Sequence, residues 1–200
     1  MSRPVRFSFA GLPVSRWRNG GGETREIISC PPDAGAEPAA FAWRASIATI
    51  DRDGAFSSFP GVDRIIALLE GDGVLLDNAA GGTHALTRPG VPHAFAGEDR
   101  ISARLAGGPS RDFNIMIRRQ ERRARVERLI GEQILPAGRD GVLYVLAGRW
   151  RLDGEAALTP GEGVWWQQLG APLRLRPADG DGVALWADIT HGELPAMRCE

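Results

Sequence analysis

The chain has 200 residues, 43% of them hydrophobic, and a formal net charge of −1. This length is enough for a substantial core, and the near-zero charge gives no general attraction for nucleic acid or for an anionic membrane. There is no run of about 18 apolar residues and no apolar segment typical of a signal peptide, so we expect a cytoplasmic protein without a membrane partner.

The 26 glycines and 14 prolines divide the chain into short segments, and helix signals are nearly absent. This pattern predicts an all-β fold. The expected strands are 5–9, 24–29, 42–50, 64–69, 74–76, 84–87, 101–105 and 112–118 in the first half. In the second half they are 124–129, 133–135, 142–146, 150–152, 156–158, 163–167, 173–176 and 183–189. The proline-rich segment 31–38 is expected to be a loop.

Three consecutive glycines, at positions 20–22, lie between Trp17 and an alternating segment that begins at Thr24. Asn-Gly is a strong hairpin signal, and glycine permits conformations closed to other residues. A phosphate-binding loop is the rival interpretation, but no GK[ST] motif and no helix follow. We therefore predict a tight hairpin that leads into a strand.

Polar residues alternate with apolar ones in several later segments. Arg44 and Ser46 alternate with Trp43, Ala45 and Ile47. Either face of such a strand can point into a small barrel. Arg64 begins the most apolar strand of the first half, and Asp112 and Asn114 alternate with Phe113 and Ile115.

If Arg25, Arg44, Arg64, Asp112 and Asn114 converge at one barrel mouth, they form a site for a small carboxylate. Guanidinium groups bind carboxylates in a bidentate manner, and an amide and an acid can recognise a neighbouring N–H group. The alternative is that each arginine lies on a solvated face beside an acidic neighbour. We favour convergence for the set.

A metal cofactor is not expected. The three histidines, His84, His93 and His191, form no closely spaced pair, and an arginine at position 64 is a poor neighbour for a divalent cation. Cys30 and Cys199 lack the spacing of a metal or redox pair, so reduced thiols are expected.

Several arginines lie between residues 118 and 128, interspersed with Glu121 and Glu127. A short basic helix is one interpretation. The alternation around Ala124 and Val126 favours an exposed edge strand, on which charges discourage association. Without interleaved aromatic residues, a nucleic-acid partner is not expected.

The two halves repeat one pattern: a strand, a glycine turn, a strand, and then a Pro-Gly turn into an aromatic strand. The copies begin near residues 68 and 145. This repeat resembles the cupin pattern, a small jelly-roll barrel, and indicates a bicupin. We expect an N-terminal barrel at 1–119 and a shorter C-terminal barrel at 120–200.

Four segments together resemble the HutD/Ves family of bicupins: residues 17–27 (WRNGGGETREI), 43–48 (WRASIA), 54–64 (GAFSSFPGVDR) and 111–119 (RDFNIMIRR). The resemblance is specific over residues 17–119 and weak beyond residue 120. It implies a bacterial protein associated with histidine utilisation that binds urocanate or a formyl- or formimino-glutamate derivative. The ligand-binding residues are then expected to be Asn19, Arg25, Trp43, Arg44, Ser46, Phe59, Arg64, Asp112 and Asn114.

Three functions remain open. The main hypothesis is a metal-free bicupin that binds a small carboxylated metabolite and acts as a regulator. The second is an isomerase or hydrolase acting on the same metabolites, with Asp112 or Glu23 as general base. The third is a protein-interaction module acting through the C-terminal barrel. The sequence leaves open whether the protein forms a homodimer.

Overall fold

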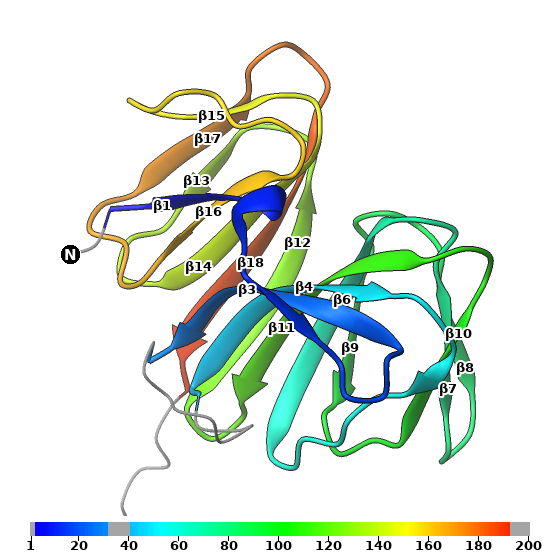
Figure 1. Ribbon diagram of the computed structural model, residues 1–200. Helices are drawn as coiled ribbons and strands as arrows, with labels where there is room; N and C mark the ends of the chain where they lie inside the picture. The colour runs from blue at the N-terminus through cyan, green and yellow to red at the C-terminus, as the bar shows by residue number, and fades with distance from the viewer. Residues whose placement is uncertain (1–2, 32–40, 193–200) are drawn as a thin grey trace, which may run out of the picture.

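The computed structural model describes residues 3–31 and 41–192, and within them the chain is almost entirely β-structure (Figure 1). The predicted all-β class is therefore confirmed. One short 3-10 helix, η1 (Phe9–Gly11), follows the first strand. Most of the predicted loop at 31–38, and Cys199, lie outside the described residues.

The N-terminal half contains two sheets that face each other. The larger sheet has the order β2-β3-β4-β11-β6-β9, with β2 (Val14–Arg16), β3 (Gly22–Cys30), β4 (Trp43–Ile50), β6 (Val62–Glu70), β9 (Pro92–Ala96) and β11 (Ser110–Arg118). The smaller sheet has the order β5-β10-β7-β8, with β5 (Gly54–Ala55), β7 (Val74–Asn78), β8 (Thr83–Leu86) and β10 (Ile101–Leu105). Ile66 and Leu68 from the first sheet pack against Leu76 and Ile101 from the second.

The C-terminal half repeats this arrangement with fewer strands. Its larger sheet has the order β1-β16-β14-β18-β12, with β1 (Val5–Ser8), β12 (Arg122–Leu129), β14 (Asp140–Ala147), β16 (Glu162–Trp166) and β18 (Val183–His191). The smaller has the order β13-β17-β15, with β13 (Gln133–Leu135), β15 (Trp150–Leu152) and β17 (Leu173–Pro177). Trp150, Trp166 and Trp186 fill the space between the two sheets and are at most 1% exposed.

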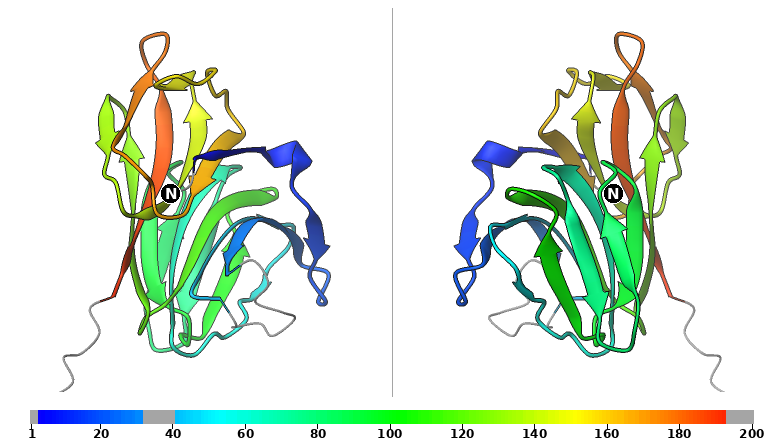
Figure 2. Two further views of the ribbon diagram at one scale, coloured as in Figure 1. Left: turned by 90° about the vertical axis from the view of Figure 1, so that its left-hand side faces the viewer. Right: turned by 90° about the vertical axis from the view of Figure 1, so that its right-hand side faces the viewer.

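Strand β1 pairs with β16, so the beginning of the chain completes the C-terminal sheet. Figure 2 shows the N-terminal segment running from one half of the molecule to the other. Val5 lies opposite Trp165 in the antiparallel register. The predicted division of the chain between residues 119 and 120 stays a prediction. Strand β1, which belongs to the N-terminal part in that division, is paired into the C-terminal sheet.

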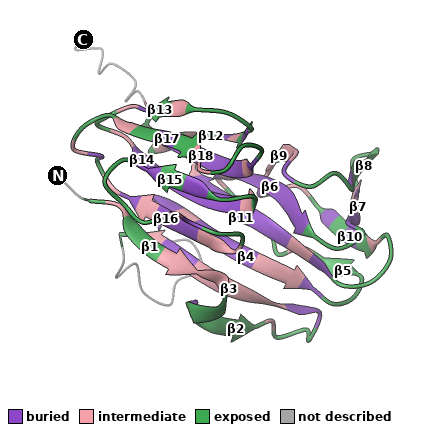
Figure 3. Cartoon of the chain, turned by 90° about the horizontal axis from the view of Figure 1, so that it is seen from above, coloured by how far each residue is buried: buried purple, intermediate pink, exposed green. Residues whose placement is uncertain are grey.

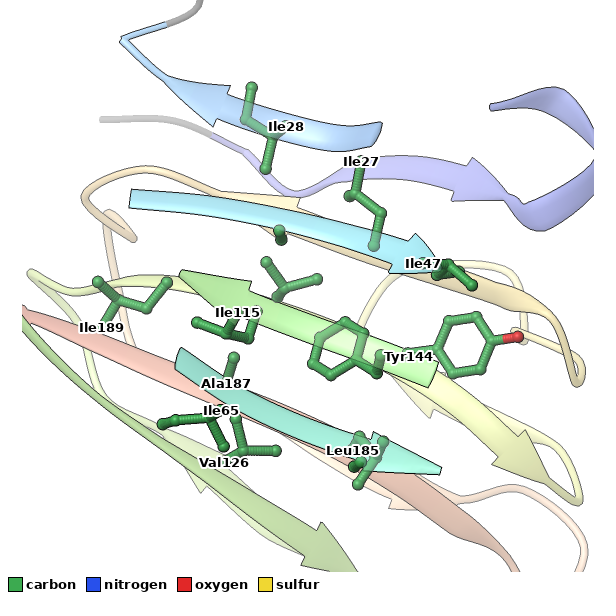
Figure 4. Close-up of a cluster of buried hydrophobic side chains, with 14 of the residues drawn as sticks. Ile27, Ile28, Ile47, Ile65, Ile115, Val126, Tyr144, Leu185, Ala187 and Ile189 are labelled. Atoms are coloured by element: carbon green, nitrogen blue, oxygen red, sulfur yellow. The ribbon is translucent and has the colours of Figure 1, made fainter. Parts of the chain in front are cut away.

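The two large sheets pack against each other and share one apolar core. Figure 4 shows side chains of both sheets directed between them. Phe113 and Ile115 of β11, both 0% exposed, contribute from one side, and Tyr144 of β14 and Leu185 of β18 from the other. The C-terminal large sheet covers the outer face of the six-stranded sheet. Both faces of β11 and β6 are therefore buried (Figure 3).

Most expected strands are present, with boundaries shifted by a few residues. The edge strand expected near residues 118–129 is confirmed, because β12 lies at the end of its sheet. The strand expected at 156–158 is wrong, since Leu158 forms only an isolated bridge with Trp150. The sequence analysis missed β2 and β5, which are too short to show a clear alternation.

We expect Ile115→Ala to lower the free energy of unfolding by about 2–5 kcal/mol, because it opens a cavity in the core that the two halves share. Most of the tryptophans lie in the C-terminal half, so their fluorescence in a urea titration reports on that half. The whole fluorescence transition should shift to a lower urea concentration, although Ile115 itself is in the N-terminal half. Ile134→Ala, at a position that is 54% exposed, is the control and should change stability by less than about 0.5 kcal/mol. An unchanged fluorescence transition in Ile115→Ala would contradict a shared core.

Candidate functional site

A pocket of about 480 Å³ lies on the inner face of the six-stranded sheet in the N-terminal half. Strands β3, β4, β6 and β11 form its floor, the β2–β3 hairpin forms one wall, and the segment around Phe56 forms another. The lining residues are Ser15, Arg16, Trp17, Arg18, Asn19, Thr24, Arg44, Ser46, Ala48, Ile50, Ala55, Phe56, Ser57, Phe59, Arg64, Ile66, Asp112, Asn114 and Met116.

Strand alternation places the polar floor residues on one face. Side chains two residues apart on a strand share a face, and cross-strand partners lie side by side. The rows across β4, β11 and β6 are Arg44–Met116–Arg64, Ser46–Asn114–Ile66 and Ala48–Asp112–Leu68. The floor therefore has a cationic end, an amide and hydroxyl middle, and an acidic end.

Arg64 is the buried cation of the pocket, with only 9% of its surface exposed. Its guanidinium group lies over the rings of Phe56 and Phe95, 4.9 and 5.1 Å from their centroids. One nitrogen, Nη2, donates to Asn114 Oδ1 at 3.3 Å, whereas Nε is buried without a hydrogen-bond partner among the described residues. Among the residues that the structure describes, Arg64 also has no acidic side chain with which it forms an ion pair.

Burial, with a smaller contribution from the nearby charge of Arg44, lowers the pKa of Arg64 to about 10. Arg64 is still a cation at neutral pH. A buried cation without an anionic partner is costly, and an anion beside Arg64 would offset that cost. Arg44 is less buried and forms an ion pair with Glu26, from Nε to Oε2 at 2.7 Å.

Asp112 forms the acidic end of the floor and is 2% exposed. Its Oδ1 accepts a hydrogen bond from Ser110 Oγ at 3.3 Å, whereas Oδ2 is buried and has no partner among the described residues. Burial raises the pKa of Asp112 to about 7, against the weaker lowering effect of the Ser110 hydrogen bond. Near neutral pH this side chain can therefore hold or release a proton.

The glycine run forms the predicted hairpin between β2 and β3. Trp17 and Gly22 close it through a backbone hydrogen bond of 2.9 Å. Gly20 has a φ of +67°, and a Cβ atom on Gly22 would collide with the carbonyl oxygen of Thr49. Trp17 Nε1 donates to Thr24 Oγ1 at 2.8 Å, which holds the indole against the pocket. The glycines thus serve close packing beside the site.

Most of the predicted site residues line this pocket: Asn19, Arg44, Ser46, Phe59, Arg64, Asp112 and Asn114. The structure brings them together, and their role in ligand binding stays a prediction. The expected convergence is wrong for Arg25, which does not line the pocket. Its guanidinium group lies 4.5 Å from the centroid of the Phe9 ring on the other side of the sheet and donates to the carbonyl oxygens of Phe9 and Leu12.

Trp43 also lies outside the pocket. It is 0% exposed in the core between the two large sheets, where its Nε1 donates to Asp140 Oδ2 at 2.8 Å. The physical reason is the same for both residues. Arg25 and Trp43 alternate with the pocket residues Thr24 and Arg44, so their side chains leave the sheet on its opposite face.

Sequence reasoning missed several lining residues, notably Arg16, Arg18, Phe56 and Met116. Met116 could have been found, because it continues the alternation of Asp112 and Asn114 along β11. Phe56 precedes β6 in an irregular segment, so no periodicity indicated its direction. The two arginines lie in or beside β2, which was not predicted.

Across residues 3–31 and 41–192, no three His, Cys, Asp or Glu side chains are grouped so that they could hold a metal ion. His84 and His93 stack ring on ring, with centroids 3.6 Å apart. Whether the protein works without a metal stays a prediction. Cys30 is a free cysteine, and burial raises the pKa of its thiol.

Comparisons with known proteins connect this geometry to a family. A family model described as HutD matches residues 10–185. The protein Ves of Cronobacter sakazakii is 42% identical over 188 residues, which cover 92% of this chain and 98% of that protein. A solved structure of HutD from Pseudomonas fluorescens SBW25, described as a formate condition, has a TM-score of 0.82 at 28% identity and covers 95% of this chain and 100% of that one. A conserved protein of unknown function from Pseudomonas aeruginosa PAO1 has a TM-score of 0.80 at 26% identity, with the same coverage.

We expect the stability of the wild type to fall between about pH 4 and pH 7. The pKa of Asp112 rises on folding from 3.8 to about 7, so the folded state binds more protons in this window. The free energy of unfolding then decreases with rising pH, by up to about 1.4 kcal/mol per unit. Asp112→Asn, which cannot titrate, should remove this slope in denaturant titrations at several pH values.

The matched control for this measurement is Asp77→Asn. Arg104 and Thr83 lower the pKa of Asp77 to about 2 in the folded state, and its titration from 3.8 in the unfolded state is nearly complete by about pH 5, so the two variants are compared between about pH 5 and pH 7. This variant should keep the slope of the wild type. A slope that is the same in Asp112→Asn and in the wild type would contradict the assigned environment of Asp112.

Proposed function

Because this chain belongs to the HutD family and has the bicupin fold, we propose that it binds a small carboxylated metabolite in the N-terminal pocket and regulates histidine utilisation. The ligand would be of the urocanate or the formyl- or formimino-glutamate type. We further propose that it acts in the cytoplasm without a metal. Self-association, and the absence of a nucleic-acid partner, remain predictions.

The observation that carries this proposal is the buried guanidinium group of Arg64. It lies among aromatic rings, has an unpartnered Nε and forms no ion pair among the described residues. A ligand carboxylate would supply the missing charge beside a guanidinium group that is itself largely buried. Charge-assisted bonds from a guanidinium group to a carboxylate are among the strongest hydrogen bonds in proteins.

The rest of the pocket supports an anionic ligand. Its lining contains four arginines and a single carboxylic acid, Asp112. Arg16 and Arg18 are exposed and would attract an anion toward the opening. Arg44 could replace its ion pair with Glu26 by an ion pair with the ligand, because the side chain of Glu26 is 41% exposed and can return to water. Ser46 and Asn114, which lie beside Arg64, could contact a carbonyl or amide group next to the carboxylate.

One observation also favours an enzymatic function. Asp112 is buried in the pocket, has a pKa of about 7 and carries an unpartnered oxygen, as a general base at neutral pH would require. Glu23, the other base considered from the sequence, forms an ion pair with Arg25 and does not line the pocket. Binding without turnover remains the main proposal, because the pocket shows no second acid or nucleophile paired with Asp112.

In the described part of the chain, no helix is long and apolar enough to cross a membrane.

We expect isothermal titration of the wild type to show binding of urocanate, formylglutamate or formate. Arg64→Met should weaken that binding by roughly thirtyfold or more, the equivalent of about 2 kcal/mol for losing a buried charge pair. The same substitution removes an unpaired buried cation, so the ligand-free protein should be as stable as the wild type or more so.

Arg104→Ala is the control, because Arg104 lies in the same half but is exposed and pairs with Asp77 outside the pocket. It should bind as the wild type does. A wild type that binds none of these compounds, or an Arg64→Met variant that binds equally well, would refute the proposed site.

The enzymatic alternative is tested by incubating purified protein with urocanate or formylglutamate and following the products by chromatography. We expect no turnover. Turnover that Asp112→Asn abolishes would replace the binding proposal with the enzymatic one.

A further inference from the structure

The pocket is rich in hydrogen-bond donors, and apart from the exposed hydroxyl groups of Ser15 and Ser57 its side-chain acceptors are almost all occupied. Asn114 Oδ1 accepts from Arg64, and Ser46 Oγ accepts from the amide nitrogen of Asn114. On the hairpin side, Thr24 Oγ1 accepts from Trp17, and Asn19 Oδ1 accepts from the backbone N–H of Gly21 at 2.9 Å. A ligand that offers only acceptors would therefore meet donors throughout the pocket.

Asp112 Oδ2 is the exception among the described residues. It is a buried side-chain oxygen in the pocket lining, it has no partner, and it belongs to a residue that is 2% exposed. Leaving such an acceptor unsatisfied costs free energy, and a charged acceptor costs more. A group on the ligand that donates a hydrogen bond would satisfy it.

We propose that Asp112 determines the specificity of the site by accepting a hydrogen bond from an N–H group of the ligand, so that the pocket selects compounds with a carboxylate at one end and an N–H donor at the other. This inference rests on the proposed function, because it requires a carboxylate at Arg64. The inference adds a second contact between protein and ligand, beyond the one at Arg64, and assigns this second contact to Asp112.

The strand geometry places Asp112 close to Asn114, the residue that contacts Arg64. Asp112 and Asn114 are neighbours on the same face of β11, and their Cα atoms are roughly 6.6–6.8 Å apart, as expected for two residues of a strand. Asn114 in turn contacts Arg64. The strand register places Asn114 and Ile66 between Asp112 and Arg64, so the middle of the ligand would meet one amide and one apolar side chain.

Binding of an N–H donor requires the ionised form of Asp112. The pKa of this residue is about 7 in the free protein, so below that pH many molecules must release a proton before the donor can bind. The proton passes to the buffer. The other charged groups of the pocket are Arg44 on β4, Arg64 on β6, and Arg16 and Arg18 of the hairpin. None of these forms an ion pair with Asp112 in the described residues.

The test uses two matched compounds in which the carboxylate is the only titrating group. That carboxylate is already ionised near neutral pH. One is a pyrrole-acrylate whose ring N–H is at the position furthest from the carboxylate, and the other is the furan-acrylate with an oxygen there. The wild type should bind the pyrrole compound about tenfold or more tighter. Below pH 7 its affinity should rise with pH, by at most about tenfold per unit. Titration in two buffers of different ionisation enthalpy should show proton release at pH 6 and almost none at pH 8.

Two variants separate this role from a structural one. Asp112→Asn should abolish the proton release, and Asp112→Leu should bring the two affinities close to equal, with folding checked by circular dichroism. Asp77→Asn, which changes a partly exposed acid outside the pocket, should behave as the wild type does.

Equal affinities of the wild type for the two compounds would overturn the inference while leaving the proposed function intact. The same holds if neither compound binds although formate does so through Arg64. A wild type that binds none of the three compounds would overturn the proposed function, and the inference with it.

Discussion

Strand β11 is hydrogen-bonded to β4 on one side and to β6 on the other, and this pairing determines what the pocket contains. Both faces of these strands are buried, one against the C-terminal half and one inside the N-terminal half. Phe113 and Ile115 therefore enter the core between the halves, while Asp112 and Asn114 enter the pocket. A shift of the register by one residue would exchange the two sets and would place two polar side chains in the apolar core.

The two halves have similar architecture but use their interiors differently. The space between the C-terminal sheets is filled by Trp150, Trp166 and Trp186, whose indole nitrogens lack hydrogen-bond partners among the described residues. The corresponding space in the N-terminal half holds Arg64 and Asp112 beside a cavity. Packed tryptophans give the molecule stability, whereas a buried cation and an unpartnered acid cost stability, as is typical of residues that serve a function. The two halves of the duplicated fold thus differ in whether the space between their sheets is filled by packed side chains or left partly open as a pocket.

Much of the fold and of the site could be predicted from the sequence, because both depend on local alternation and on specific motifs. The strands, the hairpin at the glycines and the exposed edge at β12 follow from residue pattern alone. The positions of Arg25 and Trp43 could not be predicted. In an isolated sheet the polar face meets water and the apolar face meets the core, but here a second sheet covers the apolar face, and only tertiary packing decides which face borders the pocket. The pairing of β1 with β16 was equally hidden, since no short-range signal joins segments so far apart.

That pairing has a consequence for the synthesis of the chain. Val5 and its partner Trp165 are separated by most of the sequence, so β1 leaves the ribosome long before β16 exists. At elongation rates of about 5–20 residues per second the delay is on the order of 10 to 30 s. During this time the N-terminal half can form its own sheets, while β1 remains an unpaired strand with Val5 and Phe7 uncovered. The five-stranded sheet therefore cannot be completed until β16 has been made, and the first strand to be synthesised is among the last to find its partner.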